Sequence, residues 1–456
     1  MRRILWFRRD LRVDDNPLLS QDGEVLPIFI FDPHILESLE KNDRRVTFIF
    51  NNLLKLKREL KDRGLELALF YGKPRDVFAS ILSKHPFDEV CASGDYEDYA
   101  KERDKEISHL LPFRYLHDTY IFAPDEVLKS DGTPYLVFTP FYNRVKALFK
   151  AEHMREYFPA SPTLVPFEFE RLHCIDGVVQ TPKTIALESI GFIPQPLPTT
   201  LTRSPAQKLD RFAPLIARYS IDRDFMARES TSGLSSDLRF GTISIRAVLR
   251  WLAKRKQEGM NTEPFFRELI FREFYAMLLY HFPHLAHHNF RYPFKGVTNE
   301  HHYEAFTRGR TGVPIVDAGI RQLLSTGEIH NRVRMIVASF FTKNLLLPWQ
   351  WGEAFFARHL NDYDAASNIL SWQWSAGTGV DPQPYFRIFN PYVQAEKFDK
   401  DATYIHQWVD ELQEVSSKNL HSESALHSMK IIGYPHPIVK HKTSSDEAKR
   451  YFSASL

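Results

Sequence analysis

The residues of this chain best suited to chemistry lie close together between positions 361 and 391. The segment NDYDAASNILSWQWSAGTGVDPQPYFRIFNP mixes aromatic residues with carboxylates and amides, and its glycines and prolines interrupt regular structure. Buried carboxylates and amides need polar partners, and a flat polar cofactor would supply them. The segment therefore predicts a ligand site, and its chemically distinctive residues are Asp362, Asp364, Asn368, Trp372, Trp374 and Arg387.

A second candidate for ligand binding is the run TSGLSS at 231–236, which follows Tyr219 and Arg223. Small and hydroxyl-bearing residues before a helix present backbone N–H groups to an anion such as a diphosphate. The alternative is an N-cap cluster, in which the hydroxyls only cap the helix. The run by itself leaves both interpretations open.

Two helical segments add polar groups at helical spacing. Glu268 and Arg272 are four residues apart in FFRELIFREFY, so they share a face and could form a simple ion pair. In HNRVRM at 330–335 the helical period places Asn331, Arg334 and Met335 on one face. Arg332 points away from that face.

Several kinds of enzyme site have no candidate residues in this sequence. It shows no Ser-His-Asp arrangement, no metal-ligand spacing and no Walker loop, so hydrolysis lacks a candidate set and no metal site is predicted. A cofactor would then carry the reaction, with the protein supplying orientation and electrostatics.

The joint pattern of motifs resembles the DNA photolyase/cryptochrome family, and most closely the class I cyclobutane pyrimidine dimer photolyases. FRRDLRVDDNP near the N-terminus is followed by ELIFREF, GVPIVDA, HNRVRM, SWQW and PYFRIFNP, in the family's order and spacing. Each motif is weak or moderate alone. Together they cover essentially the whole chain and would rarely arise otherwise.

The resemblance implies FAD as the cofactor, in its reduced anionic form. Asn368 matches the residue beside flavin N5, where an amide can hydrogen-bond a reduced flavin without demanding a proton. Asp362 would pair with Arg272 at the polar edge of the flavin, in a cavity flanked by Asn368, Arg272 and Trp374. The implied FAD-binding residues are Tyr219, Thr231, Ser232, Leu234, Ser235, Arg272, Asn331, Arg334, Asp362, Asp364 and Asn368.

The resemblance also implies a deoxyribodipyrimidine photo-lyase that acts on ultraviolet-damaged DNA. A cyclobutane pyrimidine dimer would be flipped out of the duplex. It would receive an electron from excited FAD and later return it. Glu268 and Asn331 would hydrogen-bond the pyrimidine edges, with Met335 filling a gap beside them. An apolar wall would come from Phe271 and Trp374, and phosphate contacts from Arg223, Arg332 and Arg387.

The resemblance leaves an electron relay and an antenna chromophore open. Trp349 and Trp372 match two relay tryptophans, but the third is absent and its neighbourhood offers Tyr292 or Phe294. An antenna, if the chain binds one, is expected to be a deazaflavin or a flavin rather than a folate. The residues assigned to catalysis are Glu268, Asn331, Met335, Asn368, Trp349 and Trp372.

Other functions stay in consideration. A cryptochrome-type blue-light photoreceptor would use the same flavin without repair, and a (6-4) photolyase would place histidines around Asn331 and Met335. A flavin electron-transfer protein without DNA would need neither Arg332 nor Glu268. A plain helical scaffold would leave the carboxylates and amide of 362–368 unexplained.

Composition sets wider limits. A chain of 456 residues predicts two or three domains. A net charge of +2 means that any DNA-binding face is a local patch. Two cysteines give no disulfide framework. We find no signal peptide or membrane-spanning run and expect a cytoplasmic monomer with no membrane partner.

The pattern of apolar residues predicts two architectures in one chain. Apolar strands at 4–7, 25–31, 65–71 and 90–92 alternate with helices, which predicts an α/β doubly wound parallel sheet domain over residues 1–125. Residues 126–198 are proline-rich and predict an interdomain connector. Helical periodicity over 199–456 predicts an all-α domain, and the resemblance assigns FAD and DNA binding to it. The candidate helices cover 206–217, 243–256, 264–280, 313–325 with an early proline, 329–346 and 351–360. Beyond about residue 421 the polar tail is predicted to be mobile or loosely docked.

Overall fold

The computed structural model describes residues 1–165 and 186–454. Contacts divide the chain into two compact units that interleave in sequence. Unit 1 contains residues 1–128, 144–211 and 233–262, and unit 2 contains residues 129–143, 212–232 and 263–456. The predicted domains, divided at 125 and 198, instead follow one another along the chain. Residues 166–185 of the predicted connector lie outside the described residues.

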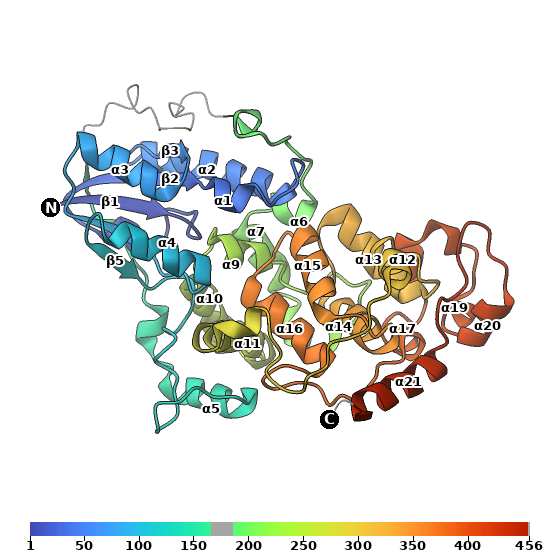
Figure 1. Ribbon diagram of the computed structural model, residues 1–456. Helices are drawn as coiled ribbons and strands as arrows, with labels where there is room; N and C mark the ends of the chain where they lie inside the picture. The colour runs from blue at the N-terminus through green and yellow to red at the C-terminus, as the bar shows by residue number, and fades with distance from the viewer. Residues whose placement is uncertain (166–185, 455–456) are drawn as a thin grey trace. The chain divides into compact units, whose positions relative to one another are not determined.

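Unit 1 is built on a parallel sheet (Figure 1), so the predicted doubly wound α/β architecture is confirmed. The strand order is β3-β2-β1-β4-β5, with β6 paired to β2. The half-exposed β5 and the two-residue β6 were not predicted, because neither has a continuous apolar run. The strands are β1 (Arg2–Phe7), β2 (Glu24–Phe31), β3 (Ala68–Tyr71), β4 (Glu89–Ser93), β5 (Phe113–Leu116) and β6 (Thr163–Leu164).

Alternate residues of each strand face opposite sides of this sheet, and helices cover both sides. Leu5 and Phe7 of β1 belong to the core formed with α2 (Arg44–Lys61). Ile4 and Trp6 belong to the other core, with α3 (Pro74–Lys84) and α4 (Asp98–Ser108). The further helices of this unit are α1 (Pro33–Leu36), α6 (Thr199–Thr202), α9 (Ser235–Phe240) and α10 (Ile245–Gln257).

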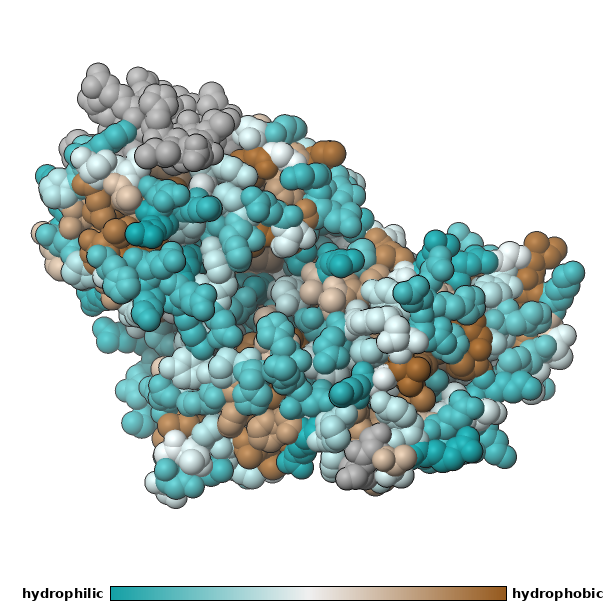
Figure 2. Space-filling view, viewed as in Figure 1, coloured by the Kyte–Doolittle hydropathy of each residue, from teal (hydrophilic) through white to brown (hydrophobic). Residues whose placement is uncertain are grey.

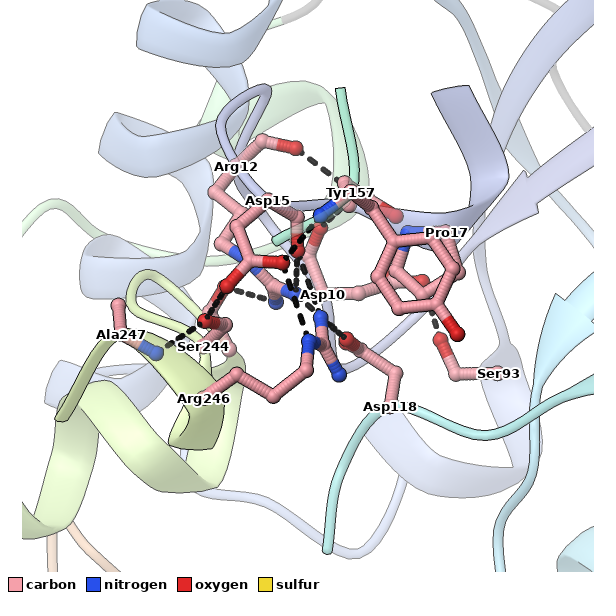
Figure 3. Close-up of polar contacts among 12 residues, drawn as sticks. Asp10, Arg12, Asp15, Pro17, Ser93, Asp118, Tyr157, Ser244, Arg246 and Ala247 are labelled. Carbon is pink, nitrogen blue, oxygen red and sulfur yellow. Dashed lines mark hydrogen bonds and ion pairs between the residues drawn. The ribbon is translucent and has the colours of Figure 1, made fainter. Parts of the chain in front are cut away.

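A buried charge network attaches α10 to the loops that follow β1 and β5 (Figure 3). Asp118 accepts hydrogen bonds from Arg12 at 2.5 Å and from Arg246 at 2.7 Å. Asp15 accepts from Arg246 Nε at 3.0 Å and from Arg250 at 2.9 Å. Residues 233–262 are therefore held in unit 1 by paired charges as well as by apolar packing.

Unit 2 is helical, as predicted for the C-terminal part of the chain (Figure 1). The predicted helix over 329–346 is divided in the structure, because a π-helical turn at Phe340–Asn344 follows α14. The helices are α8 (Tyr219–Asp222), α11 (Glu263–His281), α12 (Glu300–Thr307), α13 (Pro314–Thr326), α14 (Asn331–Ser339), α15 (Trp349–His359), α16 (Ala365–Ala376), α17 (Pro391–Phe398), α18 (Thr403–Trp408), α19 (Ser417–Leu420), α20 (Glu423–Ser428) and α21 (His441–Ala454); α5 (Phe138–Leu148) and α7 (Pro205–Phe212) cross the boundaries between units. Short 3₁₀ turns lie at Pro17–Ser20, Ala151–Met154, Leu187–Ile190, Ile216–Arg218, Pro283–Ala286 and Asp410–Leu412.

The prediction of a loosely docked tail after about residue 421 is wrong. Tyr434 donates its hydroxyl to Asp317 of α13 at 2.6 Å, and both residues are buried. Phe452 of α21 packs against Phe294, with ring centroids 4.6 Å apart. A few buried anchors hold this segment, and its polar average composition concealed them.

The molecular surface has no unusual apolar feature on the face shown in Figure 2. That face is mostly hydrophilic, and its hydrophobic residues form small groups. Scattered exposed hydrophobic residues are normal on protein surfaces. Among residues 1–165 and 186–454, no helix combines the length and hydropathy needed to cross a membrane.

Candidate functional site

Four helices of unit 2 bring most of the predicted site residues together. Helix α11 contacts both α8 and α16, and α14 contacts α16. Residues far apart in sequence therefore converge on neighbouring helices. Tyr219 lies on α8, Glu268, Phe271 and Arg272 on α11, Asn331, Arg332, Arg334 and Met335 on α14, and Asn368, Trp372 and Trp374 on α16.

The first turn of α16 is fixed by two polar side chains. Asp364 is the N-cap residue and accepts from the backbone N–H of Ser367 at 3.0 Å. One turn later, Asn368 is buried and donates its Nδ2 to Glu353 of α15, at 2.9 Å to Oε1 and 3.1 Å to the backbone carbonyl. Glu353 therefore sets the orientation of the amide predicted to lie beside the flavin.

Glu353 is a site residue that the sequence analysis missed. It is the only charged residue in the aromatic-rich segment WQWGEAFF, and only its position opposite Asn368 indicates a role. Burial raises the pKa of the Glu353 carboxyl, although hydrogen bonds from Asn368 and Tyr363 oppose that rise. A carboxyl in such surroundings is more readily protonated than an exposed one.

Glu353→Gln is expected to change how stability depends on pH. A raised folded-state pKa contributes stability that is present at low pH and is lost as pH rises through that pKa. Glutamine does not titrate, so the stability advantage of the wild type over Glu353→Gln should shrink as pH rises. Urea unfolding of both proteins across the carboxylate range measures it. A stability advantage of the wild type that grows with pH would contradict a raised pKa for Glu353.

A carboxylate–guanidinium pair joins α14 to the loop before α16. Arg334 donates to both oxygens of Asp362, at 3.0 and 2.9 Å, and its Nε donates to the carbonyl of Ile329 at 3.0 Å. The predicted partner of Asp362 was Arg272. The cation that the structure places on Asp362 is Arg334, so this corner of the site holds fixed positive and negative groups.

The TSGLSS run crosses from one unit to the other. Thr231 and Ser232 belong to unit 2, and Leu234 and Ser235 belong to unit 1. Helix α9 begins at Ser235 with Leu234 at its N-cap, and Leu234 makes no side-chain capping hydrogen bond. The hydroxyls therefore do not occupy the N-cap position, which was the alternative interpretation of this run.

Tyr219 is held between two aromatic rings. Its ring meets Phe212 and Phe265 edge-on, with centroids 5.5 and 5.4 Å apart. Burial raises the pKa of Tyr219 to about 12, and the charge of Glu268 adds to the rise. The phenol is therefore a neutral hydrogen-bonding group at physiological pH.

The arginines assigned to DNA phosphates differ in their surroundings. Arg223 forms an ion pair with Glu268. Arg332 pairs with Asp224 at 2.8 Å, and its guanidinium lies over the ring of Phe398. The third, Arg387, is exposed in the loop before α17.

The start of α14 presents an amide and a thioether together. Asn331 is exposed, and its Nδ2 lies 3.9 Å from the sulfur of the half-buried Met335. The neighbouring His330 is the N-cap and accepts from the N–H of Arg332 at 3.1 Å. Burial lowers the pKa of His330 to about 4, so this imidazole is neutral at physiological pH.

A cavity of about 180 Å³ lies beside Phe271 and Trp374, the two residues predicted to form an apolar wall. One face of Phe271 is covered by Phe138, with ring centroids 3.4 Å apart and an angle of 5° between the planes. Asn368 and Arg272 are not among the residues that line this cavity. This cavity is therefore lined by Trp374, but it is not the predicted cavity flanked by Asn368, Arg272 and Trp374.

The two predicted relay tryptophans are buried, with 2% of Trp372 and 3% of Trp349 exposed. Trp349 donates its indole N–H to Asn289 at 2.8 Å, and Asn289 donates to the carbonyl of Tyr292 at 3.0 Å. Tyr292 is 40% exposed, whereas Phe294 is 5% exposed. Of the two candidates for the surface end of a relay, Tyr292 is the one that reaches solvent.

Comparison with known proteins identifies the family of this chain. Residues 3–163 match the family model of DNA photolyase, and residues 265–454 match that of the FAD binding domain of DNA photolyase. A deoxyribodipyrimidine photo-lyase of Synechococcus sp. is 36% identical, over 99% of this chain and 96% of its own length. The chain belongs to the DNA photolyase family.

Solved structures agree with this membership. An archaeal photolyase from Sulfolobus tokodaii, described with two FAD molecules, is 33% identical with a TM-score of 0.82 and full coverage of both chains. A cryptochrome from Synechocystis sp. has a TM-score of 0.85 over 98% of both chains. Its identity is only 21%, so it shows a shared fold.

The residues of this DNA photolyase family member fit FAD by their chemistry. A guanidinium, a carboxylate and an amide from Arg334, Asp362 and Asn368 match the mixed donors and acceptors along the edge of an isoalloxazine ring. Tyr219, Thr231 and Ser232, all in unit 2, supply neutral hydroxyl groups that can donate to a diphosphate. Within the described part of the chain, no group of three or more His, Cys, Asp or Glu side chains could hold a metal ion.

Proposed function

We propose that this chain repairs cyclobutane pyrimidine dimers in ultraviolet-damaged DNA in a light-driven reaction. Arg334, Asp362 and Asn368 would hold reduced anionic FAD, which would supply an electron on excitation by blue or near-ultraviolet light for reversible transfer to the dimer. The chain's own residues bind and orient the flipped dimer, hold the flanking phosphates and exclude water from the site.

One observation carries this proposal. The helices α8, α11, α14 and α16 converge in unit 2, of which residues 265–454 match the FAD binding domain. The residues that they bring together are those assigned to FAD and to the lesion. The similarity to deoxyribodipyrimidine photo-lyases over nearly the whole of both chains supports the same activity.

The surroundings of α14 favour a cyclobutane dimer over a (6-4) product. Its first turns carry the exposed Asn331 and the half-buried Met335, which neither donate nor accept a proton at physiological pH. The adjacent His330 is half-buried, neutral at physiological pH and engaged in capping its own helix. The chemistry present at this position is hydrogen bonding to pyrimidine edges, which a cyclobutane dimer requires.

Repair of irradiated oligothymidylate tests the proposal. In blue light, the purified flavoprotein is expected to restore the absorbance of thymine, and in darkness it is expected to do nothing. Repair in the dark, or repair of (6-4) products alone, would contradict the proposal. Photoreduction of the flavin with no repair of either lesion would favour a photoreceptor instead.

Replacing Glu268 or Asn331 with alanine tests the residue assignments separately. Each variant is expected to lose about 10-fold or more in repair at equal flavin content, since each removes hydrogen bonds to a partly buried ligand. Glu268→Ala is expected to bind flavin normally, whereas Asn331→Ala also removes a side chain assigned to FAD. The flavin spectrum is the control for folding. Unchanged repair by both variants would refute the lesion contacts while leaving the activity in place.

A second chromophore and the oligomeric state remain expectations with simple measurements. We propose a deazaflavin or flavin antenna, and the Sulfolobus tokodaii photolyase described with two FAD molecules supports a second flavin. Quantifying the chromophores released from denatured protein gives their identity and number per chain. We expect a monomer, which light scattering of the flavoprotein checks.

A further inference from the structure

Two residues assigned to different parts of the DNA are paired with each other in this structure. Arg223 follows α8 directly, and its guanidinium forms an ion pair with the Glu268 carboxylate on α11. Their side chains are 35% and 30% exposed, so the pair is partly shielded from water. Under the proposed function, on which this inference rests, Arg223 holds a phosphate and Glu268 binds the lesion. The ion pair competes with both of these contacts.

The next residue repeats the arrangement. Asp224 pairs with Arg332 at 2.8 Å, and only 17% of the Arg332 side chain is exposed. Two of the three arginines assigned to phosphates therefore already carry a carboxylate of the same chain. Arg387, the third, is exposed.

An arginine that is already neutralised contributes little to non-specific DNA binding. Affinity for any DNA comes largely from cations that replace the counterions of phosphates. Undamaged DNA offers Arg223 a phosphate but offers Glu268 nothing. Its binding would leave a partly buried carboxylate without its cation, which is unfavourable.

We propose that the Arg223–Glu268 ion pair makes this chain selective, because it opens only to a ligand that satisfies both partners at once. A carboxylate accepts hydrogen bonds and donates none, so Glu268 needs N–H donors. The imide N–H groups of a flipped pyrimidine dimer are such donors, and the adjoining phosphate is the anion for Arg223. Intact, stacked DNA presents the phosphate without the donors. The ion pair thus raises specificity by disfavouring the wrong ligand.

The variant Glu268→Gln tests this directly. It keeps the shape of the side chain and frees Arg223 for phosphate. Affinity for an undamaged duplex is expected to rise about 3- to 10-fold, and the plot of log affinity against log salt to steepen by about 0.9. Affinity for the same duplex with one thymine dimer is expected to fall. Fluorescence anisotropy in the dark measures both. Undamaged duplex bound no more tightly by the variant than by the wild type would overturn the proposal.

Two matched variants separate this effect from a simple change of net charge. Glu304→Gln removes one negative charge from an exposed ion pair on α12, where Glu304 lies 2.7 Å from Arg308, and is expected to leave affinity for undamaged DNA nearly unchanged. In an Arg223→Met background, Glu268→Gln should no longer tighten binding of undamaged DNA. Tightening of similar size in either case would contradict a specific role for Arg223.

A second measurement does not depend on how Glu268→Gln folds. Arg223→Met alone is expected to make the salt dependence on dimer-containing DNA shallower by about 0.9 and to leave that on undamaged DNA unchanged. A loss of salt dependence on both DNAs would mean that Arg223 contacts phosphate regardless of damage, and would overturn the proposal.

The proposed function and this inference fail in different ways. A wild-type flavoprotein that repairs no dimers in light would refute the function itself. A wild type that discriminates, together with variants that do not behave as described, would refute only the role of the ion pair.

Discussion

Replacing Asp317 with alanine is expected to lower the free energy of unfolding of unit 2 by roughly 3–5 kcal/mol. The carboxylate is fully buried and accepts hydrogen bonds of 2.6–2.9 Å from the N–H and hydroxyl of Thr311, the N–H of Gly312 and the hydroxyl of Tyr434. Alanine removes every acceptor at once, and each buried donor left without a partner costs about 1–3 kcal/mol. Urea unfolding followed by tryptophan fluorescence measures the loss.

Tyr434→Phe is the matched control for this prediction. It removes one donor and leaves Asp317 its bonds to Thr311 and Gly312, so a loss of only about 1–2 kcal/mol is expected. Because Tyr434 anchors the segment after residue 421, Asp317→Ala should also speed proteolytic cleavage there. If Asp317→Ala were no less stable than Tyr434→Phe, the cluster would not hold the segment in place.

The motif around Asp317 illustrates how far the sequence could be interpreted. GVPIVDA predicted a helix with an early proline, and α13 begins at Pro314. The sequence could not show why position 312 needs glycine, because the reason is a contact with a segment more than 120 residues away. Gly312 has a φ of +76°, and a Cβ there would lie 2.4 Å from the carbonyl of His436. Only glycine lets the C-terminal segment pass so closely.

Local periodicity was sufficient to predict most elements, because the period of apolar residues depends on neighbours in sequence. The predicted helices over 264–280, 313–325 and 351–360 correspond to α11, α13 and α15. The π-helical turn at Phe340–Asn344 has no such signature. Interleaving of the two units could not be predicted either, since it depends on contacts between distant segments.

In the candidate site, the sequence predicts which residues share a helix face but not which side chains pair across elements. Helical spacing correctly places Asn331 and Met335 next to each other. It could not show that Glu353 holds Asn368, or that Arg334 pairs with Asp362, because those partners lie on other elements. Family resemblance assigns roles to positions, and the pairings among side chains come only from the three-dimensional arrangement.

The other large effect is expected in unit 1, where Asp118→Ala should cost roughly 3–5 kcal/mol. Asp118 is 4% exposed and is shared by the guanidinium groups of Arg12 and Arg246. Alanine would leave two buried cations with one anion fewer. The control is Glu59→Ala, which breaks an exposed ion pair with Lys55 on α2 and is expected to cost less than about 1 kcal/mol. Equal losses in the two variants would contradict a structural role for the buried network.

The pH dependence of Asp118→Ala distinguishes lost charge from lost packing. Burial acts to raise the pKa of Asp118, but Arg12 and Arg246 outweigh it and hold that pKa below its usual range. The stabilising contribution of Asp118 is therefore present above the unfolded pKa of about 4 and is lost as pH falls through the folded pKa.

Asp10 behaves in the opposite sense, because burial and the charge of Asp118 raise its pKa to about 6. Its contribution is lost as pH rises through that value, and removing Asp118 relieves part of the loss. The stability gap between wild type and variant should thus be widest between about pH 4 and pH 6 and narrow on both sides. Thermal unfolding across that range checks it, and a gap independent of pH would show that packing, not charge, holds α10 to the sheet.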